Sequence, residues 1–596
     1  MTTKYAQTWD LDPIFRGESE STTLKETLVN LEKQLPLLKK QILALDTTTD
    51  VPPLKDWNRV LEQLQQLDIQ LFEANSFIYC LEAQNMNDEK AKALRNHANQ
   101  LSASFQSVIT ALESQVTKVS NKYWEQLLAD PQIKPISFYL IEKRQQAFEK
   151  LSPSQEELVS DLSVDGYHAW EQMYYAIVSG MKIPYDENGK TTYLSVGQAA
   201  NKLVNPNRSV RQKVFAKWEE AWESQAHLFV ETINHLAGYR LQLYKHRKWD
   251  HILKEPLAYN RMQEKTLDAM WNAVESGKGH LSQYLKRKAK LLGLNQLSWY
   301  DVSAPLSENA KQITYDEAAD FIVKQFGLFS TDLAEFAQHA FEQRWIEAEN
   351  RSGKNPGGFC TSFPISKESR IFMTYSGTTQ NLFTLAHELG HAYHSYVMKD
   401  LPPLVQNYAM NVAETASTFA ELIVIDASIK QAKTKEEKIA LLDDKLQATT
   451  AYFMDIHSRF LFEKRFYEQR KQGSLGISQL CELMEGAQKE GFAHSLSQYH
   501  PYFWASKLHF YGTDVPFYNF PYTFGYLFSM GIYARALEEG ASFASKYVEL
   551  LCDTGRMTVE DLAARHLGVD LTQPDFWQSA VRLSLADVDE FLRLTE

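Results

Sequence analysis

The chain has 596 residues and a mass of 68.6 kDa, more than one domain usually contains, and 44% of its residues are apolar. We therefore expect two or more lobes. The net charge of −13 disfavours a nucleic-acid partner, because phosphates are bound by Lys and Arg. Neither a signal peptide in residues 1–7 nor an apolar run of about 18 residues is recognised, so no membrane partner is predicted and the cytoplasm is the expected location.

The first 190 residues are predicted to form long helices. Apolar residues recur every three or four positions from Leu24 to Leu45, and Pro36 should kink this helix. An antiparallel pair within the chain is favoured over a coiled-coil dimer arm, because three heptads broken by proline are short for a coiled coil. A second helical region is expected from Pro52 to about Ser120. The oligomeric state is not predicted.

A cluster of turn-forming residues at Pro184–Gly189 separates two helical stretches. We place the domain boundary there, with an N-terminal helical lobe at 1–189. The catalytic domain, with the metal site and a C-terminal helical region, then covers 190–596.

Residues 370–375 are predicted to form a strand shortly after the breaker-rich stretch at 351–358. An edge strand at this place could pair with an extended substrate through backbone hydrogen bonds, with Tyr375 as a substrate-binding residue. The alternative is a structural strand in a small sheet, and the two are compatible.

The most informative motif is HELGH at residues 387–391, within a stretch of helical apolar spacing. On a helix, His387 and His391 project from the same face and can share one metal ion. Glu388 then lies beside that ion, as in the His-Glu-x-x-His motif of zinc hydrolases, where the glutamate is the general base. The motif predicts a metallohydrolase.

His394 is also on this face, but it lies about 10 Å along the helix axis from His387, too far to share its ion. The pair His391 and His394 would bracket no carboxylate base. We therefore interpret His394 as a packed histidine or one that supports a ligand from outside the first coordination sphere.

A catalytic zinc needs a third protein ligand. The metzincin pattern is excluded, because it requires Gly and His where this chain has His394 and Val397. Glu414 is the favoured third ligand, because it is the first glutamate after the motif. It lies in a predicted helix rich in Ala, Ser and Thr, whose short side chains allow two helices to pack closely. Glu421, two turns later, either accepts a hydrogen bond from a ligand imidazole or is an ordinary surface carboxylate.

The segments FTLAHELGHAYHSY and VAETASTFAE resemble the oligoendopeptidase F branch of the thimet-oligopeptidase-like zinc peptidases. Further similar segments begin at Trp9, Asp165 and Pro516, so the resemblance covers nearly the whole chain. It implies a mostly α, two-lobed fold, with a small β-sheet beside the active-site helix and a deep cleft that admits short unfolded peptides.

The resemblance also implies roles for individual residues. It implies one zinc ion held by His387, His391 and Glu414, with Glu388 as general base. It further implies that tyrosines and a histidine from a late segment hold the substrate and the oxyanion. The candidates are His509 and Tyr526 as catalytic residues, and Tyr518 and Tyr522 as substrate-binding residues, although aromatic residues at helical spacing are more often core.

The function predicted from these residues is zinc-dependent cleavage of internal bonds in short peptides. One alternative is a helical zinc carboxypeptidase or dipeptidase, which needs a cation to bind the terminal carboxylate of its substrate; Arg208 and Arg211 are candidates. A second alternative is a non-catalytic scaffold that binds peptides, although no ligand or base is missing from the motif.

Overall fold

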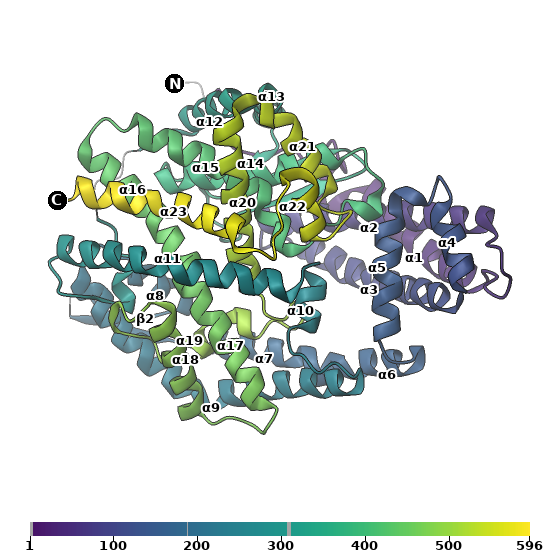
Figure 1. Ribbon diagram of the computed structural model, residues 1–596, viewed down its shortest axis with the longest axis horizontal. Coiled ribbons are helices and arrows are strands. Elements are labelled where there is room, and N and C mark those ends of the chain that lie inside the picture. Colours follow the sequence, from purple (N-terminus) through teal and green to yellow (C-terminus); the bar gives the residue numbers. More distant parts are fainter. Residues whose placement is uncertain (1–3, 188, 307–311) are drawn as a thin grey trace.

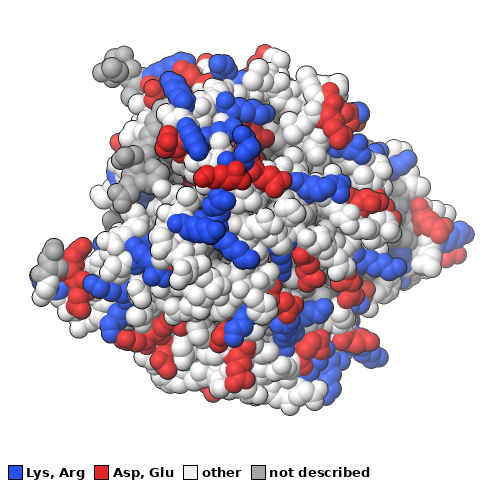
Figure 2. Space-filling model, turned by 60° about the vertical axis from the view of Figure 1, so that its left-hand side comes forward, with Lys and Arg blue, Asp and Glu red and all other residues white. Residues whose placement is uncertain are grey.

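The computed structural model describes residues 4–187, 189–306 and 312–596, and helices dominate it (Figure 1). The predicted mostly α fold class is therefore confirmed. Within the described residues, no helix is both long enough and apolar enough to cross a membrane. Lys and Arg are interspersed with Asp and Glu over the face shown in Figure 2.

The N-terminal helices form a bundle at the right of Figure 1. Helix α1 begins after Ser21, whose hydroxyl accepts a hydrogen bond from the Leu24 N–H at 3.3 Å, and it continues through Pro36. It buries the predicted apolar face against α2 and α3, so the pairing within the chain is confirmed. The helices are α1 (Thr22–Leu43), α2 (Leu54–Gln84), α3 (Glu89–Lys118), α4 (Asn121–Ala129) and α5 (Ser137–Glu149).

Two hydrophobic cores organise the molecule. The first contains residues between Trp9 and Leu140, and the second contains Tyr5 and residues between Tyr167 and Phe591. The packing thus changes between residues 140 and 167, upstream of the boundary predicted at 189. Phe363 and Phe372, from the sheet beside the metal site, belong to the first core, so this sheet connects the two.

The segment predicted as a turn between helices is a β-hairpin. Strands β1 and β2 pair antiparallel, and Gly189 has the positive φ of 76° that a tight turn favours. Asn188, inside the predicted turn, lies outside the described residues. The elements of this region are α6 (Pro153–Ser163), α7 (Ala169–Gly180), β1 (Ile183–Glu187), β2 (Lys190–Leu194), α8 (Val196–Leu203), α9 (Arg208–His246), α10 (Lys254–Tyr259) and α11 (Glu264–Leu291).

A three-stranded sheet in the order β4-β6-β5 packs against the helix that carries the motif. Strand β6 is the predicted strand, but it lies in the centre of the sheet, so its prediction as an edge strand is wrong. The free edge belongs to β5, which forms no backbone hydrogen bond with a described segment other than β6. The elements are β3 (Leu297–Ser298), α12 (Tyr315–Phe329), α13 (Thr331–Glu342), β4 (Ile346–Glu347), β5 (Phe359–Phe363) and β6 (Glu368–Phe372).

Helices α14, α15 and α20 pack side by side and form the centre of the second core (Figure 1). Glycines permit their close approach: a Cβ at Gly390 of α14 would lie 2.4 Å from the Ala416 carbonyl oxygen of α15. The remaining elements are α14 (Thr379–Met398), α15 (Met410–Gln431), α16 (Lys435–Thr450), α17 (Ile456–Arg470), α18 (Ile477–Gly491), β7 (Leu496–Gln498), α19 (Phe503–Ser506), α20 (Phe520–Glu539), α21 (Ala544–Asp553), α22 (Val559–Leu567) and α23 (Pro574–Leu594).

Candidate metal centre

The HELGH motif lies on α14, where local sequence fixes both the start of the helix and its buried face. Thr378 caps the N-terminus by accepting a hydrogen bond from the Asn381 N–H at 3.2 Å, and the Asn381 side chain accepts one in return from the Thr378 N–H. The apolar residues predicted to face the core, from Leu382 to Tyr393, are buried. The helical placement of the motif is therefore confirmed.

The structure brings His387, His391 and Glu414 together. The Nε2 atoms of the two imidazoles lie 3.2 Å and 3.4 Å from Oε2 of Glu414, and the three potential ligand atoms all lie within 4.8 Å of one another. Side-chain exposures of 24%, 21% and 27% leave the cluster accessible to solvent. Two imidazole nitrogens and one carboxylate oxygen at this spacing can hold a metal ion and leave a position open.

Two glycines hold Glu414 close to the two histidines. Gly390 lies between the histidines and allows α14 to approach the backbone of α15 at Ala416. Gly525 of α20 also packs against α15, where an added Cβ would be 3.0 Å from Cβ of Glu414. Larger side chains at either glycine would push these helices apart, so the position of Glu414 depends on both.

Glu421 pairs with one of the imidazoles. Its Oε2 lies 3.0 Å from Nδ1 of His387, so Nδ1–H can donate to the carboxylate while Nε2 faces Glu414. A carboxylate in this position fixes the tautomer and the ring orientation of a metal-binding histidine. Burial alone would lower the pKa of His387, but its hydrogen bonds to Glu414 and Glu421 raise that pKa well above its usual value.

We expect Glu421→Gln to weaken metal binding about 10- to 100-fold, because an amide orients the ring less strongly than a carboxylate does. Competition with a chromophoric chelator would measure the affinity. Glu436→Gln, at an exposed position in the first turn of α16, is the matched control. A Glu421→Gln affinity within about twofold of the control would contradict the orienting role.

Glu388 is buried beside the cluster, with 7% of its surface exposed. Its Oε2 has no hydrogen-bond partner among the described residues, and its Oε1 would lie 3.5 Å from a Cβ at Gly358, immediately before β5. Burial raises the pKa of Glu388 above its usual value. A buried carboxylate with a free oxygen and raised basicity is suited to accept a proton from a reacting group.

His394 does not join the cluster. It is fully buried, its Nε2 lies 2.9 Å from the Thr554 hydroxyl oxygen, and its ring stacks on Tyr408 at 4.1 Å. Burial lowers the pKa of His394 to about 3, so its imidazole is neutral. It packs the C-terminal part of α14 against the segment that follows α21.

Three of the late aromatic residues form a group near the cluster. The His509 ring lies 5.2 Å from that of Tyr518 and 6.0 Å from that of Tyr522, and the two tyrosine rings are 5.6 Å apart. Burial, a hydrogen bond to Tyr518 and the charge of Glu414 raise the pKa of Tyr522. The charge of Glu414 is therefore one cause of that shift, after burial and Tyr518.

The structure does not bring Tyr526 into this group. Its hydroxyl lies 3.0 Å from that of Thr449, its ring stacks on Tyr452 at 4.5 Å, and only 4% of its surface is exposed. The expected position of Tyr526 is corrected, because α20 directs its side chain toward α16 instead. Tyr375 is likewise buried and donates a hydrogen bond to the Ile313 carbonyl oxygen at 3.0 Å.

Two neighbours of the site were not predicted. Arg459 forms a hydrogen bond with Asn519 at 3.3 Å, and its charge adds to burial in lowering the pKa of His509. The charges of Glu421 and Glu414 add to burial in raising the pKa of Tyr452. Neither Arg459 nor Tyr452 belongs to a motif with recognisable spacing, so only the tertiary structure reveals them.

A mostly helical fold that assembles an HExxH pair, a downstream glutamate and a buried adjacent carboxylate defines a helical metallopeptidase. The comparisons agree: the model of "Peptidase family M3" matches residues 203–583, and that of "Oligopeptidase F" matches residues 116–183. The chain belongs to peptidase family M3, a family of metallopeptidases, and is a metalloendopeptidase.

Individual relatives match along nearly the whole chain. An oligoendopeptidase F homolog of Lactococcus lactis is 24% identical over 606 aligned residues, covering 99% of this chain and 97% of its own. A putative peptidase of Chlamydophila abortus has a similar structure, with a TM-score of 0.85 at 20% identity and coverage of 99% and 98%. The oligoendopeptidase-F of Enterococcus faecium gives a TM-score of 0.69 at 18% identity and coverage of 96% and 99%. The resemblance predicted from the motifs is confirmed.

Proposed function

We propose that this metalloendopeptidase uses one zinc ion to cleave internal peptide bonds in short, unfolded oligopeptides. The observation that carries the proposal is the convergence of His387, His391 and Glu414 beside Glu388, whose Oε2 has no partner among the described residues. The relatives' names, which include oligoendopeptidase and oligopeptidase, support peptides as the substrate class.

His387, His391 and Glu414 would hold the zinc ion, since two imidazole nitrogens and one carboxylate oxygen are a common donor set of catalytic zinc. When bound there, zinc lowers the pKa of water and polarises a carbonyl group. Glu421 keeps the His387 imidazole in the tautomer that presents Nε2 to the ion.

Glu388 is the general base of the proposed reaction. Its free Oε2 takes one proton from the attacking water while the water oxygen forms a bond to the scissile carbonyl carbon. The carbon–nitrogen bond then breaks, and the carboxyl group of Glu388 passes that proton to the leaving amine. The burial that raises its pKa favours proton uptake, which a fully hydrated carboxylate performs less well.

The aromatic group forms the proposed wall opposite the ligands. We assign stabilisation of the oxyanion to the Tyr522 hydroxyl, whose pKa responds to Glu414, with Tyr518 and His509 as its neighbours. Tyr526 has no part in this assignment, because its hydroxyl already pairs with Thr449.

The free edge of β5 is the proposed site for the substrate backbone. It begins next to Gly358, close to Glu388, and its outward N–H and C=O groups have no backbone partner among the described segments. An extended peptide can add to such an edge as another strand. Recognition through the backbone predicts a broad tolerance of substrate sequence.

The two arginines considered for the exopeptidase alternative do not support it, because both already have a partner. Arg208 and Arg211 both bind the fully buried carboxylate of Asp301, with nitrogen–oxygen distances of 3.0 Å and 2.8 Å. Neither guanidinium group is free to bind the terminal carboxylate of a peptide.

A peptide blocked by acetylation at its N-terminus and amidation at its C-terminus tests the endopeptidase assignment. We expect cleavage at an internal bond, because the proposed reaction requires no terminal charge. Mass spectrometry of the products would locate the cut. If only the unblocked version of the same peptide is cut, and only at its last residues, the exopeptidase alternative replaces the proposal.

A further inference from the structure

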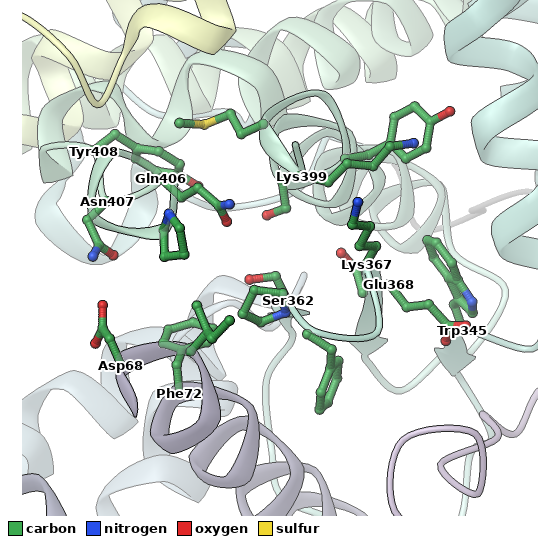
Figure 3. Close-up of a pocket in the computed structure, with 18 residues that line it drawn as sticks. Asp68, Phe72, Trp345, Ser362, Lys367, Glu368, Lys399, Gln406, Asn407 and Tyr408 are labelled. Carbon is green, nitrogen blue, oxygen red and sulfur yellow. The ribbon is translucent and has the colours of Figure 1, made fainter. Parts of the chain in front are cut away.

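A cavity of about 190 Å³ lies beside the C-terminal end of α14 (Figure 3). Residues of α2, the end of β5, the end of α14 and the segment Pro403–Tyr408 form its walls. Tyr408 lines the cavity, and its ring also stacks on His394, which follows the HELGH motif on α14. The cavity is large enough for the terminal residue of a peptide.

Strand β5 leads from Glu388 to this cavity. The strand starts beside Gly358, next to the Glu388 carboxylate, and it ends at Ser362 and Phe363 in the cavity wall. At roughly 3.3 Å per residue, the two ends of β5 are about 13 Å apart. A substrate on the free edge of β5, with its scissile bond at Glu388, would therefore reach the cavity with a residue about four or five positions from that bond.

The charged side chains of the cavity differ in whether they have partners. Lys367 lies 2.6 Å from Asp400, Lys399 lies over the ring of Tyr396, and Glu368 lies 2.8 Å from Arg370.

Asp68 on α2 faces Asn407 across the cavity and forms no hydrogen bond or ion pair with the described residues (Figure 3). Burial raises the pKa of Asp68 to about 6, and no neighbouring cation opposes the shift. The cavity thus contains an uncompensated carboxylate that a cation would stabilise.

We propose that Asp68 binds the N-terminal ammonium group of the substrate peptide, so that the enzyme favours peptides with a fixed number of residues before the scissile bond. This inference rests on the proposed endopeptidase function. It also fixes the direction of the peptide, which runs antiparallel to β5 with its N-terminus in the cavity. Asp68 is then a substrate-binding residue that measures length from one end.

The test uses peptides with one cleavable core sequence and about two to eight residues before the scissile bond, a range that brackets the length of β5. Each is made with a free or an acetylated N-terminus, and all are amidated at the C-terminus. Measurement at pH 7 keeps Asp68 mostly ionised and the peptide amine, with a pKa of about 8, mostly protonated.

For the peptide whose N-terminus reaches Asp68, we expect acetylation to lower kcat/KM of the unmodified enzyme about tenfold. A loss of this size corresponds to one charge-assisted hydrogen bond. Asp68→Asn should lower kcat/KM for the free-amine peptide by the same factor and leave the acetylated peptide unchanged. Shorter peptides should respond to neither change, which also shows that the variant is folded. Glu62→Gln, an exposed position on the same helix, should behave as the unmodified enzyme does.

The inference would be overturned if acetylation lowered kcat/KM equally in Asp68→Asn and in the unmodified enzyme. It would also be overturned if acetylation had no effect on the unmodified enzyme at any peptide length. Both outcomes leave the proposed function intact. Dependence on a free C-terminal carboxylate instead, found with non-amidated versions, would also overturn the inference, since the peptide would run in the opposite direction. Failure of the unmodified enzyme to cut any of these peptides would reject the proposed function, and the inference with it.

Discussion

Glu388→Gln is expected to lower kcat for peptide cleavage by about 10² to 10⁴-fold while the metal ion stays bound. The amide has nearly the shape of the carboxylate, so the 7% exposed site should repack with little change, but glutamine cannot accept the proton of the attacking water. Turnover of an internally quenched peptide gives kcat, and elemental analysis of the purified variant gives the metal content.

The control for this variant is Glu335→Gln, which also removes one carboxylate charge. Glu335 is exposed on α13 and lies outside the HELGH motif. This control should retain the activity of the unmodified enzyme. If Glu388→Gln keeps more than about a tenth of that activity with its metal content intact, Glu388 is not the general base.

The second large effect is expected from Gly390→Ala. The added methyl group would meet the Ala416 carbonyl oxygen at 2.4 Å and the Ser417 Cα at 2.6 Å, so α14 and α15 must move apart. Overpacking of this kind costs about 1–3 kcal/mol in the free energy of unfolding. Distances between a bound metal ion and its ligand atoms must lie within about 0.2 Å of their usual values. Displacement of Glu414 should therefore also lower metal affinity at least about tenfold.

Gly486→Ala is the matched control, since a Cβ there would meet nothing within 4 Å inside helix α18. That substitution should leave metal affinity unchanged and stabilise the protein by up to about 1 kcal/mol, the difference in helix propensity. Thermal unfolding with and without metal, together with chelator competition, would measure both effects. Unchanged metal affinity in Gly390→Ala would show that Glu414 does not depend on the close approach of the two helices.

The placement of the two histidines could be predicted because it depends on local geometry. Four-residue spacing on a helix places His387 and His391 on one face whatever the rest of the fold does, and the apolar neighbours identify the helix. The apolar face of α1 was predictable for the same reason. Glu414 required a further step, from a helix rich in small residues to a short distance between helices.

The far wall of the site could not be predicted in the same way. Helix α20 is buried on nearly every side, so its sequence has no polar face that indicates which tyrosine points toward the metal centre. Tyr522 and Tyr526 are equivalent in the pattern. The packing of α20 on α15 and α23 gives the two side chains different surroundings, and the Tyr526 hydroxyl lies against that of Thr449.

The strands were difficult to predict from the sequence for a different reason. A run of β-forming residues predicts a strand but not its neighbours, so β6 could be recognised while its central position could not. The hairpin at residues 183–194 was missed because its proline, glycine and acidic residues obscured two short strands.

By itself, the sequence determined the helical class, the metal-binding motif and the family, because helical periodicity and exact spacing are properties of neighbouring residues. Only the tertiary structure decided that Glu421 pairs with His387, that the Tyr526 hydroxyl pairs with Thr449 while the charge of Glu414 acts on Tyr522, and that β5 carries the free edge. Each of these depends on contacts between segments far apart in the chain, whose relative positions are set by packing that no local pattern encodes.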